Sequence, residues 1–277
     1  MSRKVVFFDI DGTLWDWDGI IPDSTAKAVA ELKANGHIPI LCTGRSKGHV
    51  RDEKLLSLGF EGMIAACGSH VEYNGEMIHE DYLDKSIVKK IIDVSKECQA
   101  PIVLEGKVKH WISIKGFDKD PFVDRMIEAM GEDAVLTDDY SDDMEVNKFA
   151  GDIIKITDYP RLKSELEKDL FIIEHGNCQG FDDKEIDDNT IIGVFEGIKY
   201  GTSKAIGIKM ICDKLGIDKS DTFGIGDSNN DIEMIRYVGT GIAMGNASNE
   251  LKNEADYVTS DIHEDGVYND LKHFDLI

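Results

Sequence analysis

The sequence predicts an α/β fold: a doubly wound (Rossmann-like) parallel sheet core that is interrupted by an inserted α+β cap domain. At both ends of the chain, short apolar runs bounded by turn residues alternate with segments of helical period, which is typical of strand–helix units around a parallel sheet. This alternation stops near residue 83 and resumes near residue 192. We therefore expect residues 1–82 and 192–277 to form the core, and 83–191 to form the inserted domain.

In the first part of the core, the residues Val-Val-Phe-Phe at 5–8 suit a strand that is buried on both faces. Asn74-Gly75 between two apolar runs is a strong hairpin signal. Asp23, Ser24 or Thr25 could cap the first helix. The expected elements are strands at 5–8, 37–45 and 62–68, helices at 22–36 and 50–60, and a hairpin at 71–78.

The inserted domain is expected to begin with an amphipathic helix that Asp84 caps. The acidic stretch from Asp138 to Glu145 is most simply a solvated loop. The other expected elements are helices at 85–99, 121–131 and 159–170, and strands at 101–106, 109–114, 151–158, 171–176 and 189–197.

The last part of the chain returns to the first pattern. A helix at 202–216, capped at Thr202 or Ser203, leads into a strand that runs into an acidic loop over 221–231. The remaining expected elements are a helix at 231–239 and strands at 240–247 and 255–260.

Composition excludes several classes of partner. Asp and Glu number 54 against 31 Lys and Arg, for a formal net charge of -23, so nucleic acid and anionic membranes would be repelled. No apolar run approaches the ~20 residues of a membrane helix, and the N-terminal residues do not resemble a signal peptide. The five cysteines form no C-x-x-C pair. We expect a cytoplasmic protein. If its substrate is an anion, cations near the binding site must outweigh the negative electrostatic potential of the chain.

Polar side chains gather at the predicted carboxyl ends of the core strands, where doubly wound folds bind their ligands. Asp9 and Asp11 follow the first strand and point the same way, because side chains repeat every second residue. Each candidate alone is explained by turn or capping chemistry, but their joint placement at one sheet edge indicates a functional site. The other candidates are Thr43, Gly44 and Arg45, then Lys204 at a helix start, and the loop from Asp227 to Asp231.

The order and spelling of these blocks resemble the haloacid dehalogenase superfamily, specifically its Cof-type phosphatases with a type IIB cap. The resemblance covers most of the chain and extends to the tail at 243–267. One departure is the sequence ACGSHV at the third strand end, where family members often carry Asn-Gly-Ala. The matching motifs are DIDGT at 9–13, CTGR at 42–45, GTSKAIGI at 201–208 and GIGDSNNDIEMI at 224–235.

The resemblance implies a phosphoryl-transfer site with Mg²⁺, held by Asp9, Asp227 and the backbone carbonyl of Asp11. Mg²⁺ commonly bridges a carboxylate to a substrate phosphate, so it would also relieve the repulsion between the aspartates. In this interpretation Asp9 is the nucleophile that forms an aspartyl-phosphate, and Asp11 is the general acid and base.

The phosphate is expected to be bound by Thr43, by the backbone near Gly44, and by Lys204. Asn230 is a further candidate for phosphate binding or, with Asp231, for support of the metal or of Lys204. Arg45 is expected to contact the substrate or the cap. We expect Trp15 and Trp17 to pack within the loop after the first strand.

The expected function is Mg²⁺-dependent hydrolysis of small phosphomonoesters, sugar phosphates by resemblance to type IIB relatives. The expected partner is thus a small phosphorylated metabolite, with neither nucleic acid nor membrane involved. A phosphotransferase or phosphomutase would share every core residue, so either function remains an alternative to hydrolysis. A non-enzymatic receiver-like phosphorylation module also clusters Asp, Thr and Lys on a parallel sheet, but receivers are smaller and have no inserted cap.

Overall fold

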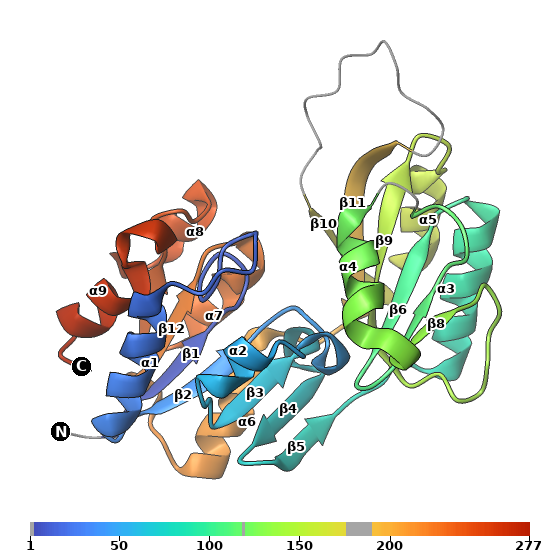
Figure 1. The fold of residues 1–277 in the computed structure, drawn as a ribbon. Coiled ribbons are helices and arrows are strands. Elements are labelled where there is room, and N and C mark those ends of the chain that lie inside the picture. The colour runs from blue at the N-terminus through green and yellow to red at the C-terminus, as the bar shows by residue number, and fades with distance from the viewer. Residues whose placement is uncertain (1–2, 118–119, 176–189) are drawn as a thin grey trace. The chain divides into compact units, whose positions relative to one another are not determined.

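The computed structural model describes residues 3–117, 120–175 and 190–277 (Figure 1). It contains two compact units. The core unit consists of Met1–Arg45, Asp52–Glu80 and Thr202–Ile277, and the inserted unit consists of Ser46–Arg51 and Asp81–Gly201. Among the described residues, no helix combines the length and the apolarity needed to span a bilayer.

The core unit is built on an eight-stranded sheet in the order β14-β13-β12-β1-β2-β3-β4-β5. The central strand β1 pairs in parallel with β2 on one side and with β12 on the other, so segments far apart in sequence end at the same sheet edge. This confirms the predicted parallel core. The strands are β1 (Val5–Phe8), β2 (Ile38–Cys42), β3 (Gly62–Ala65), β4 (His70–Tyr73), β5 (Glu76–Glu80), β12 (Thr222–Gly226), β13 (Thr240–Ala243) and β14 (Tyr257–Val258).

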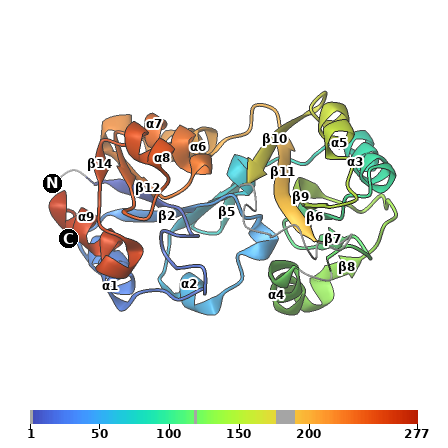
Figure 2. The same cartoon turned by 90° about the horizontal axis from the view of Figure 1, so that it is seen from above.

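Helices cover both faces of this sheet, with α6 and α7 on one side and α1 and α2 on the other (Figure 2). Ser203 caps α6, because its Oγ accepts the N–H of Ile206, as one of the two predicted caps. The predicted cap of α1 is wrong: that helix begins at Asp23 without a side-chain cap. The helices are α1 (Asp23–Ala34), α2 (Glu53–Ser57), α6 (Lys204–Leu215), α7 (Ile232–Tyr237), α8 (Asn249–Glu254) and α9 (Gly266–His273).

The inserted unit is a six-stranded sheet in the order β10-β11-β9-β6-β7-β8, with α3 and α5 on one face and α4 on the other (Figure 2). Separate apolar clusters fill the two faces, one centred on Phe149 and Phe195 and the other on Val123 and Met126. The elements are α3 (Lys85–Glu97), α4 (Pro121–Met130), α5 (Tyr159–Leu166), β6 (Ile102–Gly106), β7 (His110–Ile112), β8 (Ala134–Leu136), β9 (Val146–Ile154), β10 (Leu170–His175) and β11 (Ile191–Lys199).

The boundaries of the inserted unit differ from the prediction at its C-terminal end. The sequence assigns residues 192–199 to the core, but they belong to β11, which pairs with β9 and β10 in the inserted sheet. The acidic stretch 138–145 is a loop, as expected, whereas β8 before it was not predicted. The strands expected at 171–176 and 189–197 each extend into 176–189, which lies outside the described residues.

A short segment after the second core strand folds with the inserted unit. Within Ser46–Arg51, the Ser46 Oγ lies 2.7 Å from His110 Nε2, and Arg51 Nη1 donates to Asp133 Oδ2 at 2.8 Å. A Cβ on Gly48 would lie 2.7 Å from the Gly106 carbonyl oxygen, so the backbones pack closely. Residues 46–51 are therefore part of the inserted unit, although the sequence placed them in the core.

Candidate active site

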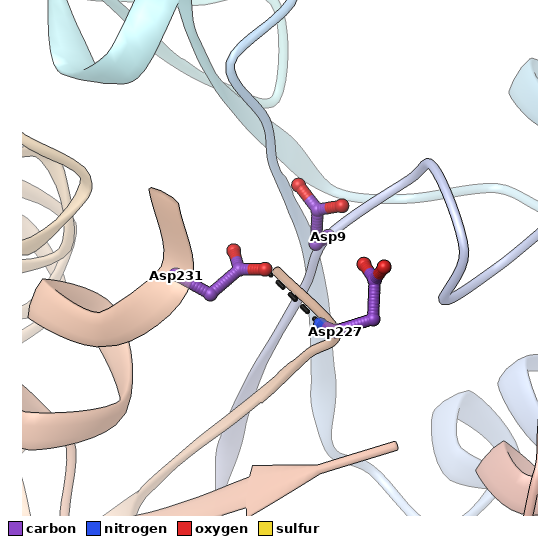
Figure 3. A group of neighbouring side chains, drawn as sticks. All are labelled: Asp9, Asp227 and Asp231. Atoms are coloured by element: carbon purple, nitrogen blue, oxygen red, sulfur yellow. Dashed lines mark hydrogen bonds between the residues drawn. The ribbon is translucent and has the colours of Figure 1, made fainter. Parts of the chain in front are cut away.

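Three carboxylates meet at the carboxyl edge of the core sheet. Asp9 follows β1, and Asp227 follows the neighbouring strand β12, so parallel pairing brings the two together. Asp231 lies one turn beyond Asp227 (Figure 3). One oxygen from each of the three lies within 4.8 Å of the others, and all three side chains are buried. The structure thus assembles residues that are more than 200 positions apart in sequence.

The turn after β1 is shaped to receive Asp227. Gly12 has a φ of +76°, and a Cβ at this position would overlap the Asp227 carboxylate. Thr13, which is fully buried, donates from its Oγ1 to Asp227 Oδ1 at 3.3 Å. The Gly-Thr of the first motif therefore places and orients a carboxylate from the opposite end of the chain.

Lys204 supplies the positive charge within this cluster. Its side chain is buried at the start of α6, and its Nζ donates to Asp9 Oδ1 at 2.6 Å and to Asp231 Oδ1 at 2.5 Å. It also donates to Asn230 Oδ1 at 3.2 Å. The other oxygen of Asp231 accepts the backbone N–H groups of residues 227 and 228. Asp231 is therefore engaged by protein donors, while Asp9 and Asp227 keep acceptor capacity that no donor among the described residues uses.

One lysine does not balance three buried carboxylates. Burial, followed by the charge of Asp231, raises the pKa of Asp9 well above its usual range. The same two causes raise the pKa of Asp227 to about 7. Burial opposes the charge on Lys204, but Asp231 and Asp9 outweigh it and raise the lysine pKa. The cluster thus favours an additional cation, and its oxygen-only ligands suit a hard divalent ion such as Mg²⁺.

Arg45 and Trp15, both in the core unit, bind the Asp11 carboxylate. The Arg45 guanidinium donates through Nε to Asp11 Oδ2 and through Nη2 to Oδ1, each at 2.6 Å. Trp15 Nε1 donates to Asp11 Oδ1 at 2.9 Å, and the guanidinium lies 5.1 Å from the Trp15 ring centroid. Arg45 therefore contacts a candidate catalytic carboxylate in this structure. Trp15 packs as expected, whereas the expectation for Trp17 is wrong, because its side chain is 77% exposed.

The second motif lies beside this cluster. Thr43 is buried, and its Oγ1 accepts the N–H of Arg45 at 3.1 Å. A Cβ on Gly44 would lie 3.4 Å from Asn230 Nδ2 and 3.6 Å from Cys67 Sγ. Gly44 and Asn230 are thus neighbours, and Asn230 contacts Lys204. Cys67, where the sequence departs from Asn-Gly-Ala, adopts a left-handed conformation that asparagine tolerates well.

Sequence reasoning missed the contacts of three residues that support the site. Thr13 and Trp15 lie within or next to the first motif, so their positions alone could have indicated their contacts. Asn246 is less accessible to such reasoning: its Nδ2 donates to the Gly12 carbonyl at 2.7 Å, and its Oδ1 accepts the N–H of Ile262 at 3.0 Å. It ties the turn after β1 to the C-terminal segment, a contact that only the tertiary fold creates.

Comparison with known proteins identifies the family. A family model described as haloacid dehalogenase-like hydrolase matches residues 6–271. The chain is 32% identical to the Bacillus subtilis (strain 168) protein named "Putative phosphatase YkrA", over the full length of both chains. It is 25% identical to 5-amino-6-(5-phospho-D-ribitylamino)uracil phosphatase YitU of the same organism, over 98% of this chain and 97% of that protein.

The fold has close counterparts among solved structures. The HAD subclass IIB sugar phosphatase BT4131 superimposes with a TM-score of 0.81 and 26% identity, over 99% of this chain and 100% of the other. A match of this length also sets aside the receiver-like alternative, which would lack the inserted unit. The chain belongs to the haloacid dehalogenase-like hydrolases, among their Cof-type phosphatases.

Proposed function

We propose that this enzyme hydrolyses small phosphomonoesters, sugar phosphates foremost, with Mg²⁺ and through an aspartyl-phosphate on Asp9. The observation that carries the proposal is the meeting of Asp9, Asp227 and Lys204 in one buried cluster beside Asp11. The names of relatives support the substrate class, since BT4131 is described as a sugar phosphatase and YitU acts on a phosphorylated ribityl compound.

The metal would be held by Asp9, by Asp227 and by the backbone carbonyl of Asp11, and it would supply positive charge that draws the phosphate dianion toward the carboxylates. Lys204 provides the protein's own positive charge at Asp9. Thr43, the backbone near Gly44, and Asn230 are proposed to donate hydrogen bonds to the phosphate oxygens. Donors held in place by the protein before the substrate arrives would favour the charge distribution of the transition state.

In the first step, an oxygen of Asp9 forms a bond to phosphorus while the bond from phosphorus to the leaving oxygen breaks. Asp11 donates a proton to that leaving oxygen, so the product alcohol departs neutral. In the second step, water attacks phosphorus and gives its proton to Asp11, and the bond between phosphorus and Asp9 breaks. Inorganic phosphate leaves and both aspartates return to their starting states.

The proposal is tested with a panel of phosphomonoesters, assayed for free phosphate with Mg²⁺ and with a chelator. We expect turnover only with the metal, and the fastest turnover on sugar phosphates. Asp9→Asn should abolish turnover while the fold survives, and Asp11→Asn should lower the rate by ~10²–10⁴-fold. Unchanged turnover in Asp9→Asn would refute the nucleophile. Formation of an isomeric phosphosugar without free phosphate would instead identify a phosphomutase.

A further inference from the structure

The inserted unit contains a cavity of about 430 Å³ that the proposed reaction does not use. Its walls come from α3, from β6, β7 and β9, and from the segments that follow α3, β7, β8 and β9, all within residues 92–156. It lies on the face of the sheet that α3 covers, because its lining residues Ile92, Leu104 and Trp111 belong to the apolar cluster of that face. Its volume falls in the range of small-molecule sites.

The floor of the cavity is apolar and includes an indole ring. Trp111, Leu104 and Met144 line it, and each is 5% exposed or less. A methionine beside an aromatic wall packs well against a further aromatic ring, because both surfaces are flat or polarizable. A planar aromatic body is therefore the chemistry that fits this floor.

Most polar groups around the cavity are already engaged by the protein. Ser113 Oγ accepts the N–H of Ile102, and Asp138 Oδ1 accepts the N–H of Ile114, each at 3.0 Å. Lys96 lies 3.1 Å from Asp139. These contacts fix the rim but leave little capacity for a ligand.

Ser95, Gln99 and Lys115 are polar lining residues whose side chains make none of these contacts, and two of them, Ser95 and Lys115, are suited to a ligand. Ser95 is 2% exposed, and its Oγ has no hydrogen-bond partner within the described parts of the chain. Lys115 makes no ion pair with any described residue. A buried hydroxyl without a partner is costly, and a lysine that is not neutralised stands out in a chain with a net charge of -23. Together they suit a ligand that carries a negative group.

The lip of the cavity has a backbone conformation that requires glycine. Gly116 has a φ of +105°, and a Cβ there would lie 2.8 Å from the Cβ and Cγ of Pro101. Both residues line the cavity. The loop after β7 thus closes tightly over the start of β6, which gives the cavity a fixed rim.

We propose that this cavity binds a small aromatic carboxylate, with its ring against Trp111 and Met144 and its carboxylate attracted to Lys115. Ser95 would donate its hydroxyl to the ligand. The proposal is independent of the phosphatase reaction, since every residue that it uses lies in the inserted unit.

The test uses naphthalene-2-carboxylate, titrated into the full-length protein by calorimetry and by tryptophan fluorescence. We expect saturable binding of one equivalent with a dissociation constant of about 1 mM or tighter, given the size of the probe. Naphthalene-2-methanol, which lacks the charge, should bind several times more weakly. The absence of saturable binding of the carboxylate at ten times that concentration would overturn the proposal.

Two variants locate the bound probe. Lys115→Glu, at an exposed position, should weaken binding of the carboxylate about fivefold and leave binding of the alcohol unchanged. Lys89→Glu, on the exposed side of α3, is the matched control and should change neither. Ala100→Leu, which narrows the cavity, should abolish binding of both probes in a protein with a native circular dichroism spectrum. Equal affinity of the carboxylate for Lys115→Glu and wild type would contradict the proposal even if Ala100→Leu fails to fold.

Discussion

Arg45 donates two parallel hydrogen bonds of 2.6 Å to Asp11, one to each carboxylate oxygen. This bidentate geometry is the strongest form of an arginine–carboxylate contact, and it requires an ionised aspartate. A proposed general acid must carry a proton, so Asp11 has to turn away from Arg45 before it can donate one. Arg45 therefore holds Asp11 in a resting position, and Trp15 fixes the same carboxylate from the other side.

Arg45→Ala is expected to lower kcat by about 10²-fold, because Arg45 stabilises and positions the ionised Asp11 that proton donation to the leaving oxygen produces. The measurement is steady-state hydrolysis of the best substrate in the panel. Arg236→Ala is the matched control, since Arg236 forms an equivalent bidentate pair with Glu254 on an exposed surface. Should the two variants have equal kcat, Arg45 does not position Asp11.

Lys204→Met is expected to destabilise the protein by about 3–5 kcal/mol, because it leaves buried carboxylates without their positive partner. Added Mg²⁺ should recover part of this loss, since a cation could replace the missing charge. Urea unfolding with chelator and with Mg²⁺ measures both effects. Lys148→Met is the control, because this lysine is also buried, between Glu105 and Glu196. The stability that this variant loses should not be recovered by Mg²⁺. An identical Mg²⁺ response in both variants would contradict a metal site at Asp9.

Asp152→Asn is expected to stabilise the protein increasingly as pH rises. Burial, followed by the charge of Asp120, raises the pKa of Asp152 to about 8. The unfolded chain releases this proton near pH 4, so Asp152 costs the native state stability progressively between about pH 4 and pH 8. Asparagine has no such proton to lose. Urea unfolding of both proteins at pH 5, 7 and 9 checks this, and a difference that does not change with pH would show that Asp152 is not protonated in the native state.

Asp270→Leu is expected to raise stability at neutral pH by about 1–3 kcal/mol. Asp270 is fully buried in α9, both of its carboxylate oxygens lack a hydrogen-bond partner among the described residues, and burial raises its pKa well above the usual range. Thermal unfolding measures the change. Asp213→Leu, at an exposed site on α6 where Lys209 pairs with the aspartate, should change stability by less than about 0.5 kcal/mol. A loss of stability in Asp270→Leu would indicate an unseen partner for this carboxyl.

Much of the core site could be predicted from the sequence because its residues follow directly from strand geometry. Asp9 and Asp227 come at the ends of strands that parallel pairing makes neighbours. Asp11 lies beyond the end of β1, so the alternation of side chains along that strand does not settle its direction. The bond from Asn246 to Gly12 could not be predicted in this way, because it depends on how the C-terminal segment folds back. The sequence also could not predict that α1 has no side-chain cap, because several residues at its start are of the types that cap helices and none of them does so.

Errors in the inserted unit have a different origin. β11 was divided between two domains because its apolar run continues up to a helix start that resembles the core pattern. Only its pairing with β9 and β10 reveals where it belongs. Trp17 is a second case in which local sequence is not sufficient. Its residue type favours burial, but the backbone of the loop leaves the ring exposed.

The folding of Ser46–Arg51 with the inserted unit has a consequence for engineering. A chimaera could exchange only residues 81–201 with those of a relative. The transplanted sheet would then meet residues 46–51 of this chain instead of the segment with which it folds in the relative. The retained Ser46 would lose His110, and the retained Arg51 would lose Asp133. Transplants that aim to change substrate preference should therefore carry both pieces of chain, residues 46–51 as well as 81–201.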